Sequence, residues 1–165
     1  MCRKIIFSMF SIFLLCVGLF SCDSSKVKVY DTMQDMDSTA WNDKKELIFP
    51  ITIKDTSAAY KIYYTVRYDN NYPFYNLYIN RTLEDSAGKP LSRRLQGMDL
   101  FKADTGTPLG SGMGSKKDYL ILSEDNYKFP YAGKYTVKLK QYMRQENIQG
   151  VSAVGLRVDK VVSEK

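Results

Sequence analysis

Apolar and polar residues alternate along much of the chain beyond residue 45. In residues 60–69, Tyr60, Ile62, Tyr64 and Val66 share one face of an extended chain, which is the period-two pattern of a half-buried β-strand. Turn-forming clusters rich in Asp, Asn, Ser, Gly and Pro separate such stretches. Strands are therefore predicted at residues 47–54, 60–69, 76–83, 91–101, 119–122, 134–144 and 151–162, with a short first strand at 27–30.

No stretch beyond residue 22 has the period of an amphipathic helix. The pattern favours an all-β fold, a single antiparallel β-sandwich of the jelly-roll or immunoglobulin-like type with about seven or eight strands. Alternation alone does not choose between a sandwich and a closed barrel, because both bury one face of each strand.

Three residues interrupt the alternation. Pro50 cannot donate to a strand ladder, so its strand is expected at a sheet edge or at a bulge. Arg81 falls on the inward face of residues 76–83, together with Leu77, Ile79 and Leu83. Gly97 lies inside a weaker strand and predicts a bulge.

The first 22 residues have the layout of a secretory signal. Arg3 and Lys4 precede an apolar run, and Leu19-Phe20-Ser21-Cys22 closes that run as a lipobox. Cleavage before Cys22 would leave its thiol to carry a diacylglycerol and to hold the chain on a lipid bilayer. The alternative is a transmembrane anchor, although the run of about sixteen residues is shorter than the roughly twenty that a bilayer core requires.

The expected organisation is a lipoprotein signal peptide at residues 1–21, a lipidated N-terminus and tether at residues 22–44, and a β-sandwich domain at residues 45–165. Residues 31–37 are acidic and rich in methionine, and they are interpreted as loop.

The composition of the chain excludes several kinds of catalytic and metal site. The chain has no histidine, which excludes histidine-based triads and histidine-ligated metal sites. Cys2 and Cys16 would leave with the signal peptide, and lipidation would occupy Cys22, so no disulfide, metal or cofactor is predicted. The formal charge of +6 loses the charges of Arg3 and Lys4. The remaining mild positive charge favours acidic partners or anionic membranes, and without a basic block nucleic acid is not expected.

Aromatic residues are the best candidates for a binding site. The chain has thirteen tyrosines, and Tyr72, Phe74 and Tyr75 gather in one predicted loop, where they would either stack on a sugar or peptide or pack over the end of the sandwich. Trp41 is interpreted either as a core plug or lid, or as a platform for a ligand. The glycine-rich residues 105–117 fit neither the spacing of a P-loop nor that of the GxGxxG motif, and they are interpreted as a turned loop.

Several segments resemble the GldH-type gliding-motility lipoproteins of Bacteroidetes. They are residues 67–77, 109–114, 128–135, 141–144 and 151–158. The resemblance implies a non-catalytic lipoprotein anchored in the cell envelope, expected in the outer membrane, which works with other envelope lipoproteins or with motility and secretion components. In a species that does not glide, it implies the equivalent envelope role. The alternatives are a surface module that binds glycan or peptide, and a hydrolase that uses paired carboxylates.

Overall fold

The computed structural model describes residues 26–36, 38 and 40–162, and the regular structure in these residues is entirely β. The strands are β1 (Lys26–Asp35), β2 (Ala40–Asn42), β3 (Leu47–Ile53), β4 (Tyr60–Tyr68), β5 (Asn76–Glu84), β6 (Pro90–Asp99), β7 (Lys117–Tyr127), β8 (Gly133–Gln141), β9 (Asn147–Gln149) and β10 (Val151–Val161). The same residues contain no helix long and apolar enough to cross a membrane.

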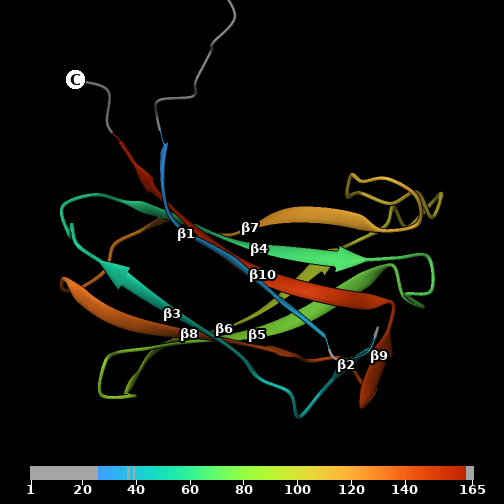
Figure 1. Cartoon of the computed structure of the whole chain (residues 1–165), viewed down its shortest axis with the longest axis horizontal. Coiled ribbons are helices and arrows are strands. Elements are labelled where there is room, and N and C mark those ends of the chain that lie inside the picture. Colours follow the sequence, from blue (N-terminus) through green and yellow to red (C-terminus); the bar gives the residue numbers. More distant parts are fainter. Residues whose placement is uncertain (1–25, 37, 39, 163–165) are drawn as a thin grey trace, which may run out of the picture.

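Eight of these strands form two four-stranded antiparallel sheets, which are stacked as a sandwich (Figure 1). One sheet has the order β1-β10-β4-β7 and the other has the order β3-β8-β5-β6, while β2 and β9 form a small separate ladder. Most connections between the described strands of the two large sheets cross from one sheet to the other, and among these strands only β5 and β6 are consecutive partners within one large sheet. This strand order is that of a jelly roll, which confirms the all-β sandwich and excludes the immunoglobulin-like alternative.

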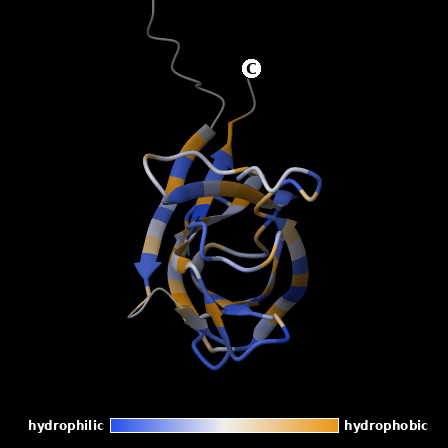
Figure 2. Cartoon of the chain, turned by 90° about the vertical axis from the view of Figure 1, so that its right-hand side faces the viewer, coloured by the Kyte–Doolittle hydropathy of each residue, from blue (hydrophilic) through white to orange (hydrophobic). Residues whose placement is uncertain are grey.

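Alternation along the strands builds the core between the sheets. β4 buries every second residue from Tyr60 to Tyr68, and β3 follows the same rule from Leu47 to Ile53. Figure 2 shows the result as hydrophobic and hydrophilic bands that alternate along the strands. In β10, Asp159 is on the outer face, but it is buried because the Arg157 guanidinium covers it and donates to both carboxylate oxygens.

Of the three predictions for residues that interrupt the alternation, the structure confirms two. β3 is an edge strand, and Pro50 is exposed on it. Arg81 faces the interior with only 2% of its surface exposed, and its Nη2 atom lies 3.4 Å from the Glu124 carboxylate. Gly97 is different, because it pairs in regular register with Tyr78 and forms no bulge.

The sandwich begins earlier than predicted. β1 pairs with β10 from Lys26 to Asp35, so the short strand predicted at residues 27–30 is confirmed, but it continues through residues that the sequence assigns to a loop. β1 lies at a sheet edge and is mostly exposed, so backbone pairing holds it and its side chains carry little hydrophobic signal. The predicted signal peptide (residues 1–21) and Cys22 lie outside the described residues.

The two ends of the sandwich differ. At one end, Lys26 pairs with Val161, so both ends of the described chain lie together (Figure 1). At the opposite end, β4 finishes beside the start of β10, where Tyr68 pairs with Val151. Residues 69–75, 100–116 and 142–146 form the connections there, and we call this the loop end.

Candidate functional site

An open hollow of about 640 Å³ lies where the outer face of the β3-β8-β5-β6 sheet meets the loop end. We call it the aromatic groove. Its lining is mainly aromatic and aliphatic, and includes Phe74, Tyr78, Leu95, Tyr142, Met143 and Arg144. The exposed fractions of Tyr78, Leu95 and Tyr142 are 41%, 52% and 62%. Large apolar side chains that are exposed together mark an interaction surface more strongly than single ones do.

The β5–β6 register builds the floor of the groove. Tyr78 points outward because Leu77 and Ile79 point into the core, and its partner in β6 is Gly97. A Cβ atom at Gly97 would lie only 2.7 Å from the Tyr78 ring, so glycine allows the ring to lie over the backbone of β6. Tyr142 is adjacent, because its N–H donates to the Tyr78 carbonyl at 2.8 Å.

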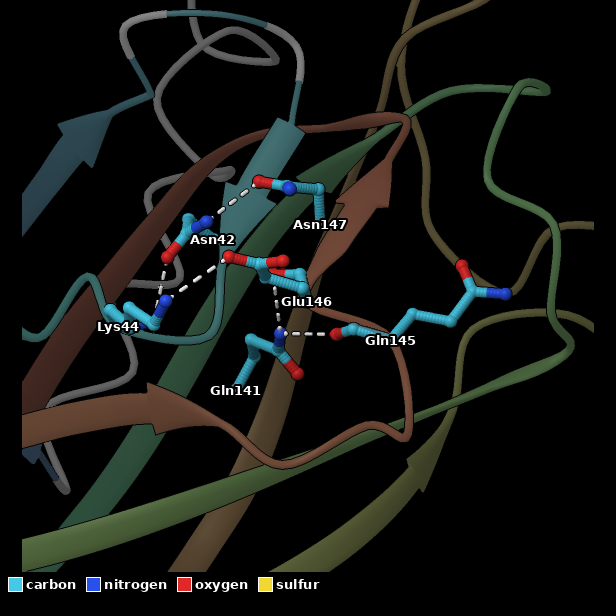
Figure 3. A network of polar contacts seen from close by, with 6 residues as sticks. All are labelled: Asn42, Lys44, Gln141, Gln145, Glu146 and Asn147. Carbon is cyan, nitrogen blue, oxygen red and sulfur yellow. Dashed lines mark hydrogen bonds and ion pairs between the residues drawn. The ribbon is translucent and has the colours of Figure 1, made fainter.

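Hydrogen bonds from one buried side chain hold the wall of the groove, the loop at residues 142–146. The Gln141 side chain is 1% exposed. Its amide nitrogen donates to the Gln145 carbonyl at 2.9 Å and to the Glu146 carbonyl at 3.4 Å (Figure 3). Its amide oxygen accepts the Met143 N–H at 2.7 Å. This one side chain satisfies three backbone groups and fixes the loop that carries Tyr142.

The small β2–β9 ladder supports the same loop from the other side. Lys44 forms an ion pair with Glu146 at 3.2 Å, and the Asn42 amide donates to Asn147 at 2.8 Å (Figure 3). These contacts are exposed and each contributes little alone. Together with Gln141, they connect the wall of the groove to β8 and to the segment that follows β2.

Of the residues predicted to bind a partner, Trp41 and Tyr72 are not on the surface. Trp41 is completely buried, and its indole N–H donates to the Lys45 carbonyl at 3.1 Å. Tyr72 is 5% exposed, and its hydroxyl donates to the Asn76 carbonyl at 2.6 Å. Burial raises the pKa of Tyr72 above its ordinary value. Both rings are core residues of the loop end, because packing between the loops removes them from solvent.

Phe74 and Tyr75 remain candidates. Phe74 is half-buried and lines the aromatic groove, and it also lines a second hollow that contains Tyr75. Tyr75 is 51% exposed. The structure therefore brings Phe74 together with Tyr78 and Tyr142, and places Tyr75 next to this group.

Sequence reasoning missed Tyr78, Leu95, Tyr142, Met143 and Arg144. A signal was available for Tyr78, because the alternation that sends Leu77 and Ile79 inward assigns Tyr78 to solvent. A large apolar residue at a solvent position of a strand calls for an explanation other than core packing. The contribution of the loop at residues 142–146 depends on the position of the chain in space, so alternation carries no signal for it.

Cations surround the groove. Arg144 lines it, and Lys140 and Leu95 both pair with Asn80 across the sheet. Arg93 lies two residues from Leu95 on the same face of β6. Among the described residues, no ion pair or side-chain hydrogen bond engages these three cations. Asp99, at the end of β6, is the acidic residue on this face of the strand.

The lining supplies aromatic faces, a thioether and a guanidinium group. These groups bind apolar surfaces and anions, so the groove is suited to binding. Among residues 26–36, 38 and 40–162, no cluster of three or more potential metal ligands occurs.

The glycine-rich loop beside the groove is a closed turn. The Lys117 ammonium group donates to the carbonyls of Gly112 and Gly114 at 3.1 and 3.0 Å. A phosphate loop presents N–H groups to its ligand. In this loop, by contrast, carbonyl groups accept hydrogen bonds from a lysine of the chain itself. This geometry agrees with the interpretation of the segment as a turned loop.

Comparison with known proteins matches residues 28–158 to the GldH lipoprotein family. The gliding motility lipoprotein GldH homolog of Christiangramia forsetii is 31% identical, and the alignment covers 93% of this chain and 96% of that protein. The gliding motility lipoprotein GldH of Flavobacterium johnsoniae is 30% identical, over 88% and 92% of the two chains. Among solved structures, the infectious bursal disease virus VP2 subviral particle aligns over 88% of this chain and 37% of that chain, at 13% identity and a TM-score of 0.42, too low a similarity to support an argument. On the evidence of the matched residues and the near-complete alignments, the chain belongs to the GldH lipoprotein family.

Proposed function

We propose that this protein is a lipid-anchored lipoprotein of the cell envelope, and that it acts as a non-catalytic accessory component of the gliding-motility machinery or of its equivalent in a species that does not glide. The observation that carries the proposal is the alignment of almost the whole chain with two gliding motility lipoproteins. The lipobox at residues 19–22 and the binding character of the aromatic groove support it.

The architecture supports an anchor at Cys22. β1 begins at Lys26, four residues after that cysteine, and four residues of extended chain span at most about 14 Å. A lipid on Cys22 would therefore keep the end of the sandwich that carries Lys26 and Val161 close to the membrane. The loop end, with the aromatic groove, would point away from the membrane toward other envelope components.

Gene deletion followed by complementation tests the proposal. Cells that lack the protein should lose colony spreading, or secretion through the envelope in a species that does not glide. The wild-type gene should restore the phenotype, and Cys22→Ser should not. Cys16→Ser is the matched control, because it makes the same chemical change within the apolar run and should leave membrane association and function intact. Unchanged spreading and secretion after deletion would contradict the proposal.

We place the protein in the outer membrane, following the expectation from the sequence. Density-gradient separation of the two membranes tests this placement, and recovery with inner-membrane markers would refute it. Protease treatment of intact cells that carry a C-terminal tag then shows whether the domain faces the periplasm or the outside.

One observation favours a second candidate function, the binding of glycans at the surface. The Tyr78 ring lies over Gly97 with 41% of the residue exposed, and an exposed aromatic face of this kind can stack on a sugar ring. A glycan array probed with the purified protein tests this function. Binding that is lost in Tyr78→Ala would favour it, and an absence of binding would remove it for the glycans on the array.

A further inference from the structure

We infer that the aromatic groove binds an acidic peptide segment with apolar side chains, supplied by a partner protein of the envelope. The inference rests on the proposed function, because it specifies what the accessory component would bind. Three properties of the groove carry it: an apolar floor, an anchored wall, and cations with no ion-pair partner among the described residues.

The charges around the groove favour an acidic partner. Arg144, Lys140 and Arg93 have no ion pair or side-chain hydrogen bond among the described residues. Lys138 is on the same strand as Lys140, but Glu84 pairs with it at 2.9 Å. The cations nearest the groove therefore keep their charge available. Arg144 suits a carboxylate especially well, because a guanidinium group presents a planar fork of donors.

The lining of the groove favours a peptide over a sugar. Leu95 and Met143 add aliphatic and thioether surface to the tyrosine rings, and methionine adapts its shape to apolar side chains of different form. Sugar hydroxyl groups need acceptors as well as donors, and the described residues that line the groove offer only the tyrosine hydroxyls and the Gln145 amide oxygen, with no carboxylate. An apolar side chain inserted between Tyr78, Leu95 and Tyr142 would remove exposed apolar surface from water.

The structure also shows a receptor that is formed in advance. Gln141 is buried and holds three backbone groups of the wall, and the main-chain bond from Tyr142 to Tyr78 connects the wall to the floor. A site that is already ordered loses less entropy when it binds a flexible segment. The segment would become ordered on the groove, and the groove would change little.

Site-specific photo-crosslinking in native cells tests the inference with the full-length protein. The probe is p-benzoylphenylalanine in place of Tyr142. The control carries it at Leu120, which is 43% exposed on β7 in the other sheet. After irradiation, the crosslinked segment is sequenced by mass spectrometry. We expect an adduct at position 142 that is absent at position 120, and the captured segment should combine Asp or Glu with apolar residues.

Charge variants make the test specific. Arg144→Glu in the presence of the probe should reduce the adduct about tenfold or more, whereas Arg144→Lys should reduce it less, because it keeps the positive charge and loses only the planar fork of donors. Lys128→Glu is the matched control, because it reverses an exposed charge beyond the groove and should leave the yield unchanged. Equal amounts of each variant in the membrane fraction show that folding and anchoring are intact.

Three results would overturn the inference. They are no adduct at position 142, an adduct with polysaccharide or with a segment that is not acidic, and an adduct whose yield survives Arg144→Glu. The anchor is tested separately through Cys22→Ser. If that variant stays functional in the membrane while the position-142 adduct persists, the anchoring proposal fails and the groove inference stands. If deletion has a phenotype but no adduct forms at position 142, the groove inference fails and the proposed function stands.

Discussion

Gly150→Ala should destabilise the loop end more than its backbone conformation alone explains. Gly150 joins β9 to β10 with a φ of +79°, in the left-handed region. A Cβ atom there would collide with the backbone nitrogen of Tyr72 and would lie 2.6 Å from its Cα atom. The two segments cannot separate easily, because the Asp69 N–H donates to the Gly150 carbonyl at 2.9 Å.

Gly88→Ala supplies the matched control, and the comparison gives the magnitude. Gly88 has a φ of +78° and nothing within 4 Å of an added Cβ atom. The left-handed conformation costs a non-glycine residue about 1–2 kcal/mol, and reduced freedom of the unfolded chain offsets about 0.4–1 kcal/mol of that. Gly88→Ala should therefore cost about 1 kcal/mol. Overpacking adds about 1–3 kcal/mol at Gly150, which gives a total of about 2–4 kcal/mol.

Urea unfolding of a fragment that covers residues 26–165 measures both free energies. The fluorescence of Trp41, which is completely buried, reports the transition. The gap between the two variants isolates the collision with Tyr72, since their φ angles are nearly equal. If both variants lose the same free energy of unfolding within about 0.5 kcal/mol, which is the usual range for neutral surface changes, the close approach of the two segments is refuted.

Three further predictions concern polar groups. Gln141→Leu should reduce the free energy of unfolding by about 1–3 kcal/mol, because it removes the side-chain partner of three backbone groups in the loop at residues 142–146. Amide hydrogen exchange in residues 142–146 should accelerate, and unchanged exchange would contradict the role of Gln141. Arg67 lowers the pKa of Asp118 by a two-point hydrogen bond at 2.7 and 2.8 Å, so this carboxylate stabilises the fold fully above about pH 4, its ordinary pKa, and loses that effect as the pH falls toward its lowered pKa. Acid titrations monitored by circular dichroism should therefore show a smaller loss of stability below pH 4 in Asp118→Asn than in the wild type, and parallel curves would refute the assignment. Arg81→Met should change the free energy of unfolding by less than about 1 kcal/mol or stabilise the fold, because it removes the buried charge itself. Glu124→Gln should cost about 3 kcal/mol, because it leaves a buried guanidinium uncompensated. The reverse order in thermal unfolding would contradict this account.

The sequence predicts the sandwich because alternation is a direct consequence of burying one face of a strand. It places Leu47–Ile53, Tyr60–Tyr68 and Asn76–Glu84 almost at their observed bounds. It finds only residues 27–30 of β1, which runs from Lys26 to Asp35, because exposed side chains accompany a strand held mainly by its backbone. It also shortens β7, which runs from Lys117 to Tyr127, because only the central residues of that strand form an apolar run.

The candidate site is less predictable for a physical reason. An aromatic residue in a loop can pack beneath its neighbours or remain exposed, and composition does not distinguish these outcomes. Tyr72 and Tyr75 are three residues apart, yet they are 5% and 51% exposed. The aromatic groove combines β5, β6 and the loop at residues 142–146, and these segments meet only through the order of the strands in the sheet.

Mass spectrometry of the intact protein purified from membranes tests the central claim most directly, because the claim requires a lipid anchor. We predict a chain that begins at Cys22 and carries the added mass of a diacylglycerol, with or without a further acyl chain. Cys22→Ser should lack that mass and should retain residues 1–21. A wild-type chain that retains residues 1–21, or that begins at another residue without lipid, would contradict the account of this protein as an anchored envelope lipoprotein.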